Sequence, residues 1–306
     1  MRISIIIPTY NRKDILRPLL ESLVADKQVP AHVELEIMVS DDKSKDGTAE
    51  MVRRDFPQVR LEEGPCKGLE MNKRSAVQKC TGDFIVVLDD DSIPRHGWIE
   101  SVVPDLERGE KLVLSKIIFH DLGHSEMQDE SHKHFFCGYR WDLMPVMLNH
   151  GGYRPQYVGI CHEFGTFIAR EVLQKVPLND PNLWSDFGSS ASFHQRASKE
   201  GYRVYFQPGA IIDHWGATQG GMKDSEGKKL VKNNCDEYTS QLIHNFIVLA
   251  RMKRVKRIPL VIAYYLAGSV YLSFRQKKNC VKYVWDGIVK GLKRKITPPI
   301  PYPDLR

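Results

Sequence analysis

The chain reads Gly82-Asp83-Phe84-Ile85-Val86-Val87-Leu88-Asp89-Asp90-Asp91 at the point that decides its fold. The five apolar residues from Phe84 to Leu88 predict a parallel strand that is buried on both faces. Three acids follow with no spacer, and they repel one another unless a cation lies among them. Oxygen ligands suit Mg²⁺ or Mn²⁺, and open α/β sheets bind ligands beyond the carboxyl ends of their strands. The stretch therefore indicates either a divalent-metal site or a solvated acidic turn.

Strand and helix patterns alternate on both sides of this stretch. Short apolar runs predict strands at residues 3–7, 35–39, 59–61, 111–119, 203–206 and 211–214, and residues 165–169 form another short apolar stretch. Apolar spacing and capping residues predict helices at residues 14–25, 46–55, 68–80 and 189–199. We therefore expect an α/β fold with a mostly parallel, Rossmann-like sheet and helices on both faces. Residues 120–157 lack a period, and the glycine-rich segment 216–227 is expected to be a lid or linker.

Charge divides the chain into an acidic body and a basic tail. Residues 222–306 hold 18 Lys and Arg against 6 Asp and Glu, a net charge of +12. Residues 1–221 hold 26 against 32, a net charge of −6. This asymmetry predicts an anionic partner for the tail, either nucleic acid or a membrane surface. The six cysteines form no CxxC pair, which predicts free thiols in a reducing cytosol.

Residues 251–278 carry an apolar segment between two basic clusters. Residues 258–274 are apolar apart from small polar residues and tyrosines, and Arg251–Arg257 and Arg275–Lys278 flank them. Pro259 and the short length weaken a membrane-spanning helix. The pattern suits a helix that lies in the interface of an anionic membrane, or a helix packed on the rest of the chain. The first alternative predicts a cytoplasmic, peripheral protein at the inner face of the membrane.

Four motifs occur in order over residues 1–215. They are Ile5-Ile6-Ile7-Pro8-Thr9-Tyr10-Asn11-Arg12, Val39-Ser40-Asp41-Asp42 through Thr48, Thr81-Gly82-Asp83-Phe84 through Asp91, and a closing segment with Arg196, Gly201-Tyr202-Arg203, Pro208 and Asp213-His214. In this order they resemble the nucleotide loop, the second-strand signature, the DXD strand and the closing segment of family-2 glycosyltransferases of the GT-A fold. The resemblance implies a GT-A domain over residues 1–220, with a nucleotide-sugar half at about 1–110 and an acceptor half at about 111–220. A basic, helical C-terminal extension over residues 221–306 would follow it.

The resemblance also implies roles for individual residues. Residues that would bind the nucleotide-sugar are Pro8, Tyr10, Arg12, Asp41, Asp42, Lys73, Arg74 and Asp90. Asp41 or Asp42 would hydrogen-bond the base, although the pair also suits a turn. Lys73 and Arg74 would meet the diphosphate or form a solvated helix face. The implied metal ligands, for Mn²⁺ or Mg²⁺, are Asp89, Asp91 and His214.

The sequence departs from the family pattern at the catalytic base. Family members usually carry Glu-Asp six to seven residues before the arginine matched by Arg196, and this chain has Ser189-Ser190 there. A serine cannot deprotonate the acceptor hydroxyl unaided. The nearby acids are Asp186 and Glu163, and we take Asp186 as the first candidate for the base.

The resemblance implies a metal-dependent, inverting glycosyltransferase. It would move a sugar from a nucleotide-diphosphate sugar to a hydroxyl of a glycan or lipid-linked acceptor, in the synthesis of cell-surface polysaccharide or glycoconjugate. The alternative is a non-catalytic module that binds a nucleotide-sugar or glycan and has lost its base. A nucleic-acid-binding protein is a third possibility, but the acidic body and the lack of a recognisable module argue against it.

Overall fold

The structure is a computed structural model that divides into two compact units. It describes residues 1–25, 29–120, 136–139, 145–147, 154–158, 163–178, 180, 182–183, 189–215, 237–252, 258–276, 279–298, 302 and 305. Unit 1 comprises Met1–Leu178, Phe193–Gln219 and Pro301–Arg306. Unit 2 comprises Asn179–Ser192 and Gly220–Ile300.

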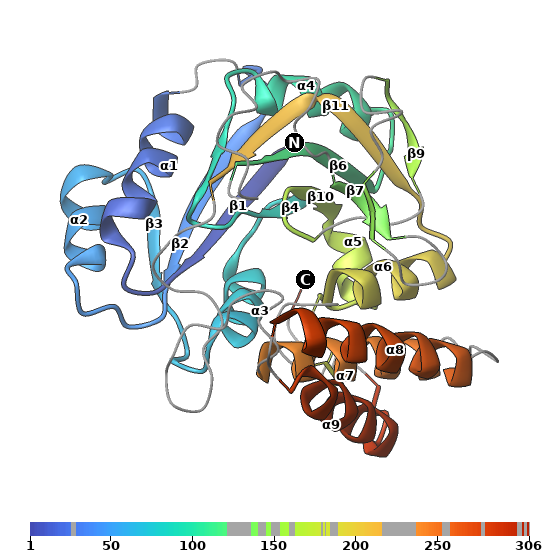
Figure 1. Cartoon of the computed structure of the whole chain (residues 1–306). Helices are drawn as coiled ribbons and strands as arrows, with labels where there is room; N and C mark the ends of the chain where they lie inside the picture. Colours follow the sequence, from blue (N-terminus) through green and yellow to red (C-terminus); the bar gives the residue numbers. More distant parts are fainter. Residues whose placement is uncertain are drawn as a thin grey trace. The chain divides into compact units, whose positions relative to one another are not determined.

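Unit 1 is built on a nine-stranded sheet (Figure 1). Its strands are β1 (Arg2–Thr9), β2 (Glu34–Asp41), β3 (Arg60–Glu63), β4 (Phe84–Val87), β5 (Ser92–Pro94), β6 (Leu112–Phe119), β9 (Gln156–Val158), β10 (Thr166–Ala169) and β11 (Val204–His214). The order is β3-β2-β1-β4-β10-β6-β11-β5, and β9 pairs with β11. The strands β3, β2, β1 and β4 run parallel, and β10 joins them antiparallel. β11 also pairs in parallel with β6, so the predicted α/β fold with parallel strands and helices on both faces is confirmed.

The helices of unit 1 follow from this strand order. They are α1 (Lys13–Ala25), α2 (Thr48–Asp55), α3 (Leu69–Lys79), α4 (Trp98–Glu107) and α5 (Arg170–Lys175), and α6 (Ser189–Lys199) begins in unit 2. The chain moves outward from β1 to β2 to β3 and then returns past β1 to β4. Because such crossovers are right-handed, the outward steps place α1 and α2 on one face and the return step places α3 on the other.

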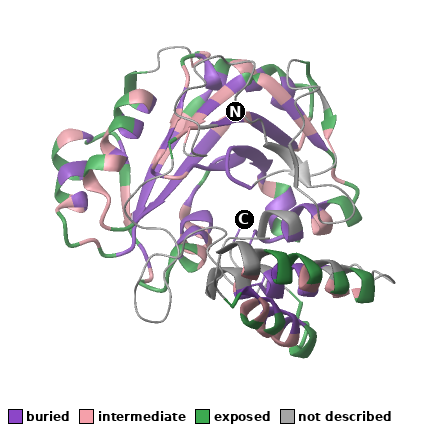
Figure 2. Cartoon of the chain, viewed as in Figure 1, coloured by how far each residue is buried: buried purple, intermediate pink, exposed green. Residues whose placement is uncertain are grey.

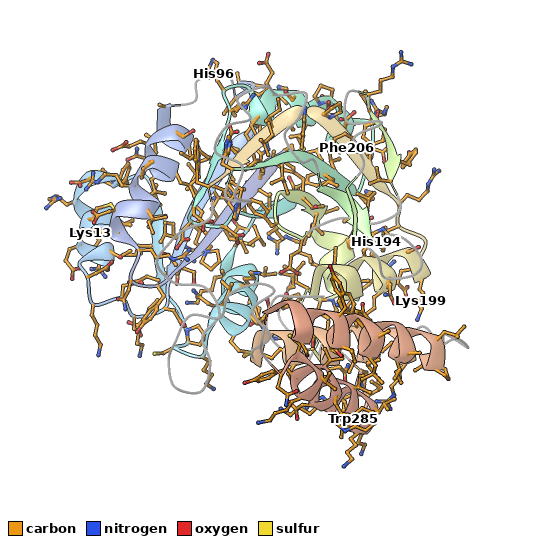
Figure 3. All side chains as sticks on the ribbon, in the orientation of Figure 1. Lys13, His96, His194, Lys199, Phe206 and Trp285 are labelled. Carbon is orange, nitrogen blue, oxygen red and sulfur yellow. The ribbon has the colours of Figure 1, made fainter. Side chains whose placement is uncertain are left out.

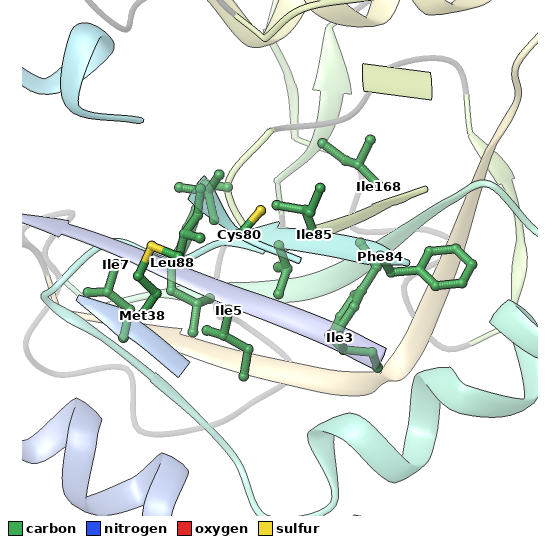
Figure 4. Close-up of a cluster of buried hydrophobic side chains, with 14 of the residues drawn as sticks. Ile3, Ile5, Ile7, Met38, Cys80, Phe84, Ile85, Leu88 and Ile168 are labelled. Carbon is green, nitrogen blue, oxygen red and sulfur yellow. The ribbon is translucent and has the colours of Figure 1, made fainter. Parts of the chain in front are cut away.

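The hydrophobic core lies on both faces of the central strands. Every residue from Phe84 to Leu88 is buried, as the uninterrupted apolar run predicted. Ile3 and Ile5 of β1 lie in the same cluster as Ile168 of β10 (Figure 4). Figure 2 shows buried strands at the centre and exposed outer faces on the helices. This core fixes the strand ends from which the candidate site projects.

Three helices lie entirely within unit 2 among the described residues. They are α7 (Glu237–Met252), α8 (Ile258–Gln276) and α9 (Cys280–Lys293). A Cβ atom added at Gly287 would lie 2.9 Å from Cβ of Ile243, so α9 packs closely on α7. Asn182 ties the two segments of the unit together by accepting a hydrogen bond from the backbone of Thr297 at 2.7 Å. None of the helices in the described residues is sufficiently long and apolar to cross a bilayer.

Several features differ from the sequence-based expectations. The strands expected at 203–206 and 211–214 form one strand, β11, with an irregularity between Gln207 and Ile211. The helices α4, α5 and α9 were not predicted from the sequence. Cys280 is disulfide-bonded, so the expectation of free thiols throughout is wrong at this position, whereas Cys66 and Cys80 are free.

The domain boundary expected at residue 220 stays a prediction, and the compact units divide the chain at other residues as well. Asn179–Ser192 group with the C-terminal helices, and Pro301–Arg306 group with the sheet. The expected lid at 216–227 lies outside the described residues. In the irregular segment 120–157, the described parts include a small antiparallel pair, β7 (Phe136–Tyr139) and β8 (Pro145–Met147).

Candidate active site

Two acids and a histidine from distant parts of the chain meet at the carboxyl end of β4. Nε2 of His214 lies 3.3 Å from Oδ1 of Asp91 and 3.7 Å from Oδ2 of Asp89. The cause is local pairing, because His214 is the register partner of Ser92 in the short strand β5. One ligand atom from each of the three side chains lies within 4.8 Å of the others. This set of two carboxylates and an imidazole suits Mn²⁺ or Mg²⁺.

Asp90, between the two acids of this triad, is buried and has partners of its own. Its carboxylate accepts hydrogen bonds from Nη1 of Arg12 at 2.5 Å and from the hydroxyl of Thr9 at 2.7 Å. Burial raises the pKa of Asp90 to about 6, although the charge of Arg12 opposes the shift. The same guanidinium lies 3.4 Å from Asp91. Arg12 therefore joins the loop after β1 to the acidic stretch, and Asp90 anchors that contact.

Asp41 and Asp42 have different surroundings at the end of β2. The carboxylate of Asp42 accepts from the backbone N–H groups of Cys66 at 2.5 Å and of Gly68 at 3.1 Å. One oxygen of Asp41, Oδ1, accepts from the backbone and hydroxyl of Ser44. Nothing in the described part of the chain donates to the other oxygen, Oδ2. Asp42 thus shapes the loop before α3, and Asp41 keeps one acceptor available for a ligand.

The loops after β1 and β2 are held to each other by hydrogen bonds from backbone N–H groups to side chains. The side chain of Asn11 accepts from the backbone of Lys45 at 2.7 Å, and Asp46 accepts from the backbone of Lys13 at 2.9 Å. Lys13 marks the start of α1 in Figure 3. Tyr10 is 52% exposed, whereas Pro8 is buried within β1. Of these two predicted nucleotide contacts, only the Tyr10 side chain is accessible to a ligand.

Lys73 and Glu163 form a buried ion pair. Nζ of Lys73 lies 2.8 Å from Oε1 of Glu163, and the two residues are 4% and 2% exposed. Lys73 also lies 3.4 Å from Glu70. The sequence suggested that Lys73 binds the diphosphate and that Glu163 is the second candidate for the catalytic base. The structure instead places each opposite the other, so either role requires the pair to separate.

Arg74 lies against a residue near the end of the chain. Its guanidinium carbon is 4.7 Å from the centre of the Tyr302 ring, a cation–π contact. Tyr302 is buried, and its hydroxyl accepts from the backbone of Leu178. Burial raises the pKa of Tyr302 above its ordinary value. No sequence pattern indicated this contact, because Tyr302 lies in a proline-rich tail.

A network behind His214 was also missed by the sequence reasoning. Arg95 donates two hydrogen bonds to Asp213, at 2.7 and 3.1 Å, and Nε2 of His120 lies 2.7 Å from the same carboxylate. Burial alone would raise the pKa of Asp213, but these hydrogen bonds hold it below its usual value. The network fixes the strand end that carries His214. The only sequence pattern that could have indicated this network is that Asp213 directly precedes His214.

Asp186, the first candidate for the catalytic base, lies outside the described residues.

The parallel strands β3, β2, β1 and β4 have Asp89, Asp91 and His214, a set that could hold a metal ion, beyond the carboxyl end of β4. This is the arrangement of a GT-A glycosyltransferase fold. A family model described as glycosyl transferase family 2 matches residues 4–176, more than half of the 306 residues. The chain belongs to this family.

Three curated relatives differ in how much of the chain they match. A GalNAc(5)-diNAcBac-PP-undecaprenol beta-1,3-glucosyltransferase of Campylobacter jejuni is 22% identical over 69% of this chain and 67% of its own length. The abequosyltransferase RfbV of Salmonella typhimurium is 34% identical over 30% of this chain and 28% of its own length. The uncharacterized glycosyltransferase YfnE of Bacillus subtilis is 29% identical over 44% of this chain, which spans about a third (34%) of that protein.

Two solved structures share the fold at low sequence identity. S. aureus TarS 1–349 in complex with UDP-GlcNAc has a TM-score of 0.54 and 18% identity, over 81% of this chain and 66% of TarS 1–349. GalNAc-T7 with UDP, GalNAc and Mn²⁺ has a TM-score of 0.59 and 17% identity, over 82% of this chain and 48% of its own. At these identities the likeness shows the fold alone.

Proposed function

We propose that this protein is a metal-dependent, inverting glycosyltransferase that uses a nucleotide-diphosphate sugar. The observation that carries the proposal is the convergence of Asp89, Asp91 and His214 beyond the buried strand β4. The acceptor is a hydroxyl of a glycan or a lipid-linked glycan. The names of the Campylobacter and Salmonella relatives support this choice, because one acts on an undecaprenol-linked saccharide and the other transfers abequose. Such a reaction belongs to the synthesis of surface polysaccharide or glycoconjugate.

Each part of the site has a task in this reaction. Asp89, Asp91 and His214 would hold Mn²⁺ or Mg²⁺, which when bound neutralises charge on the diphosphate leaving group. Arg12 holds the acidic stretch against the β1 loop through Asp90 and Asp91. The exposed ring of Tyr10 borders the nucleotide.

Release of nucleoside diphosphate tests this proposal directly. We expect the protein, incubated with a panel of nucleotide-sugars and Mn²⁺, to release the diphosphate of one of them, faster in the presence of the right acceptor. Binding of a nucleotide-sugar without any release, across acceptors, would favour the non-catalytic binding module. If the protein neither binds a nucleotide-sugar nor releases the diphosphate, both functions are contradicted.

We propose that Oδ2 of Asp41 accepts a hydrogen bond from the base of the nucleotide. Asp41 and Asp42 then form a matched pair of positions for substitution. We expect Asp41→Asn to weaken nucleoside diphosphate binding by about tenfold, because it removes a charged acceptor worth roughly 1.5–3 kcal/mol, while the melting temperature changes little. Asp42→Asn should show the reverse, a lower melting temperature, because Asp42 holds the backbone of Cys66 and Gly68. Calorimetric titration and thermal melting measure the two effects. If both variants weaken nucleotide binding equally, Asp41 is not the residue that binds the base of the nucleotide.

We infer that Asp186 supplies the general base, with Glu163 as the second candidate and a base-free retaining route as the third. The support is its place four residues before Ser190, where Gly188 permits a turn toward the acceptor, and the burial of Glu163 against Lys73. Asp186→Asn should lower turnover by about 10²–10⁴-fold and leave nucleotide affinity unchanged. If Glu163→Gln lowers turnover by this factor and Asp186→Asn does not, the roles are reversed. If only Ser190→Asp creates activity, the unsubstituted chain is a binding module.

We also infer that the protein is cytoplasmic and peripheral, held at an anionic membrane surface by residues 251–278. In the described part of α8, the exposed residues are apolar or small, among them Leu260 and Tyr271. Near-surface cations contribute about 1 kcal/mol each to such binding, so flotation with vesicles should require anionic lipid and weaken at high salt. Flotation that survives carbonate extraction would contradict a peripheral location.

A further inference from the structure

One face of α9 is buried against other residues of unit 2. Its buried residues are Cys280, Val284, Gly287, Ile288 and Gly291. The two glycines allow close approach, since a Cβ at Gly291 would lie 2.7 Å from Cβ of Ile247 in α7. Arg251 of α7 donates to the carbonyl of Gly291 at 2.7 Å and so fixes the end of the helix. The orientation of α9 in its unit is therefore well determined by contacts.

The exposed side of α9, beside the packed face, carries apolar side chains where polar ones are usual. Trp285 is 54% exposed and Leu292 is 44% exposed. They are seven residues apart, about two helical turns, and so lie on the same side of the helix. Trp285 is labelled on α9 in Figure 3. Ile296, just beyond the end of the helix, is also exposed.

Cations surround these apolar residues. Lys282 and Lys293 are exposed on α9, and Lys295 is exposed just after it. The single acid in the sequence of α9, Asp286, lies 2.7 Å from Lys290 and accepts from Ser240 at 2.6 Å. The face therefore presents positive charge next to an indole ring and a leucine. We call the set Lys282, Trp285, Leu292 and Lys293 the Trp285 face.

We propose that the Trp285 face docks on an anionic lipid surface. A tryptophan beside lysines on a helix matches the interface between headgroups and acyl chains, where the indole is buried and the cations meet anionic headgroups. A nucleic acid would neutralise the lysines but would leave Leu292 without an apolar partner. The proposal deepens the membrane association proposed for residues 251–278 and rests on it, but it assigns a second contact, on another helix.

Flotation of the full chain with defined vesicles tests the proposal. Trp285→Ser/Leu292→Ser should bind vesicles of phosphatidylcholine and phosphatidylglycerol at least about tenfold more weakly than the unsubstituted chain. Lys282→Gln/Lys293→Gln should also bind more weakly and with a smaller dependence on salt. Val24→Ser, at an exposed apolar position of α1, is the matched control and should bind normally. Because the substituted side chains are exposed, melting temperature and circular dichroism should not change.

The outcomes separate this inference from the proposed function. If the unsubstituted chain does not bind anionic vesicles, the membrane association and the Trp285 face are both refuted. If it binds, and Leu260→Ser/Tyr271→Ser on α8 abolishes binding while Trp285→Ser/Leu292→Ser does not, only the Trp285 face is refuted. If single-stranded RNA displaces the unsubstituted chain from vesicles and still binds Trp285→Ser/Leu292→Ser, the cations form a nucleic-acid site instead. Release of nucleoside diphosphate in solution should be equal in all these variants, which keeps the catalytic proposal separate.

Discussion

Asp91→Asn should lower sugar transfer by about 10²–10³-fold, the usual cost of removing one electrostatic contact to a developing charge. Asp91 lies nearer to His214 than Asp89 does, at 3.3 Å against 3.7 Å, and it also lies 3.4 Å from Arg12. Its replacement removes a negative ligand while keeping the size of the side chain. Nucleoside diphosphate binding should then become nearly independent of Mn²⁺, which titration calorimetry with and without the metal measures.

Glu34→Gln is a suitable control for the loss of one carboxylate. Glu34 is exposed at the start of β2, at the opposite end of the strands from the triad, and pairs loosely with Arg2. It should leave transfer and the effect of Mn²⁺ unchanged. If Asp91→Asn keeps the Mn²⁺ dependence of the unsubstituted chain, Asp91 is not a metal ligand and the site has been assigned incorrectly.

Lys73→Met should destabilise the sheet-containing unit by about 3–5 kcal/mol, the cost of leaving a buried charge without its partner. Glu163 is 2% exposed, and Lys73 lies 2.8 Å from its carboxylate. The expected result is a large fall in the melting temperature, with loss of activity as a consequence. Differential scanning calorimetry of the full chain measures this change.

The double variant Lys73→Met/Glu163→Leu distinguishes a buried ion pair from a general packing defect. Replacing both charges with apolar side chains often costs little, because the desolvation of both groups is avoided. We therefore expect the double variant to recover most of the stability lost in Lys73→Met. A double variant that is less stable than Lys73→Met would show that packing, and not the unpaired charge, causes the loss.

Local sequence patterns predicted the parallel half of the fold and the place of the triad. The apolar run from Phe84 to Leu88 required a buried strand, and the acids after it had to lie at the strand's carboxyl end. His214 could be placed near them only through the family resemblance. Its actual approach depends on the short strand β5, whose three residues carry too little pattern to be recognised.

The missed contacts join residues that are far apart in sequence. Lys73 and Glu163 are 90 positions apart, and no periodicity links them. Tyr302 reaches Arg74 from a tail that composition alone assigned to the basic extension. Asp41 and Asp42 looked equivalent in sequence, and only the backbone of Cys66 and Gly68 distinguishes them.

Calorimetric titration of nucleoside diphosphates into the unsubstituted protein is the most direct test of a metal-dependent nucleotide site at Asp89, Asp91 and His214. We expect one nucleoside diphosphate to bind in Mn²⁺, and to bind at least about tenfold more weakly in EDTA, because its phosphates and these three side chains would share the ion. Equal affinity in Mn²⁺ and in EDTA would contradict the account.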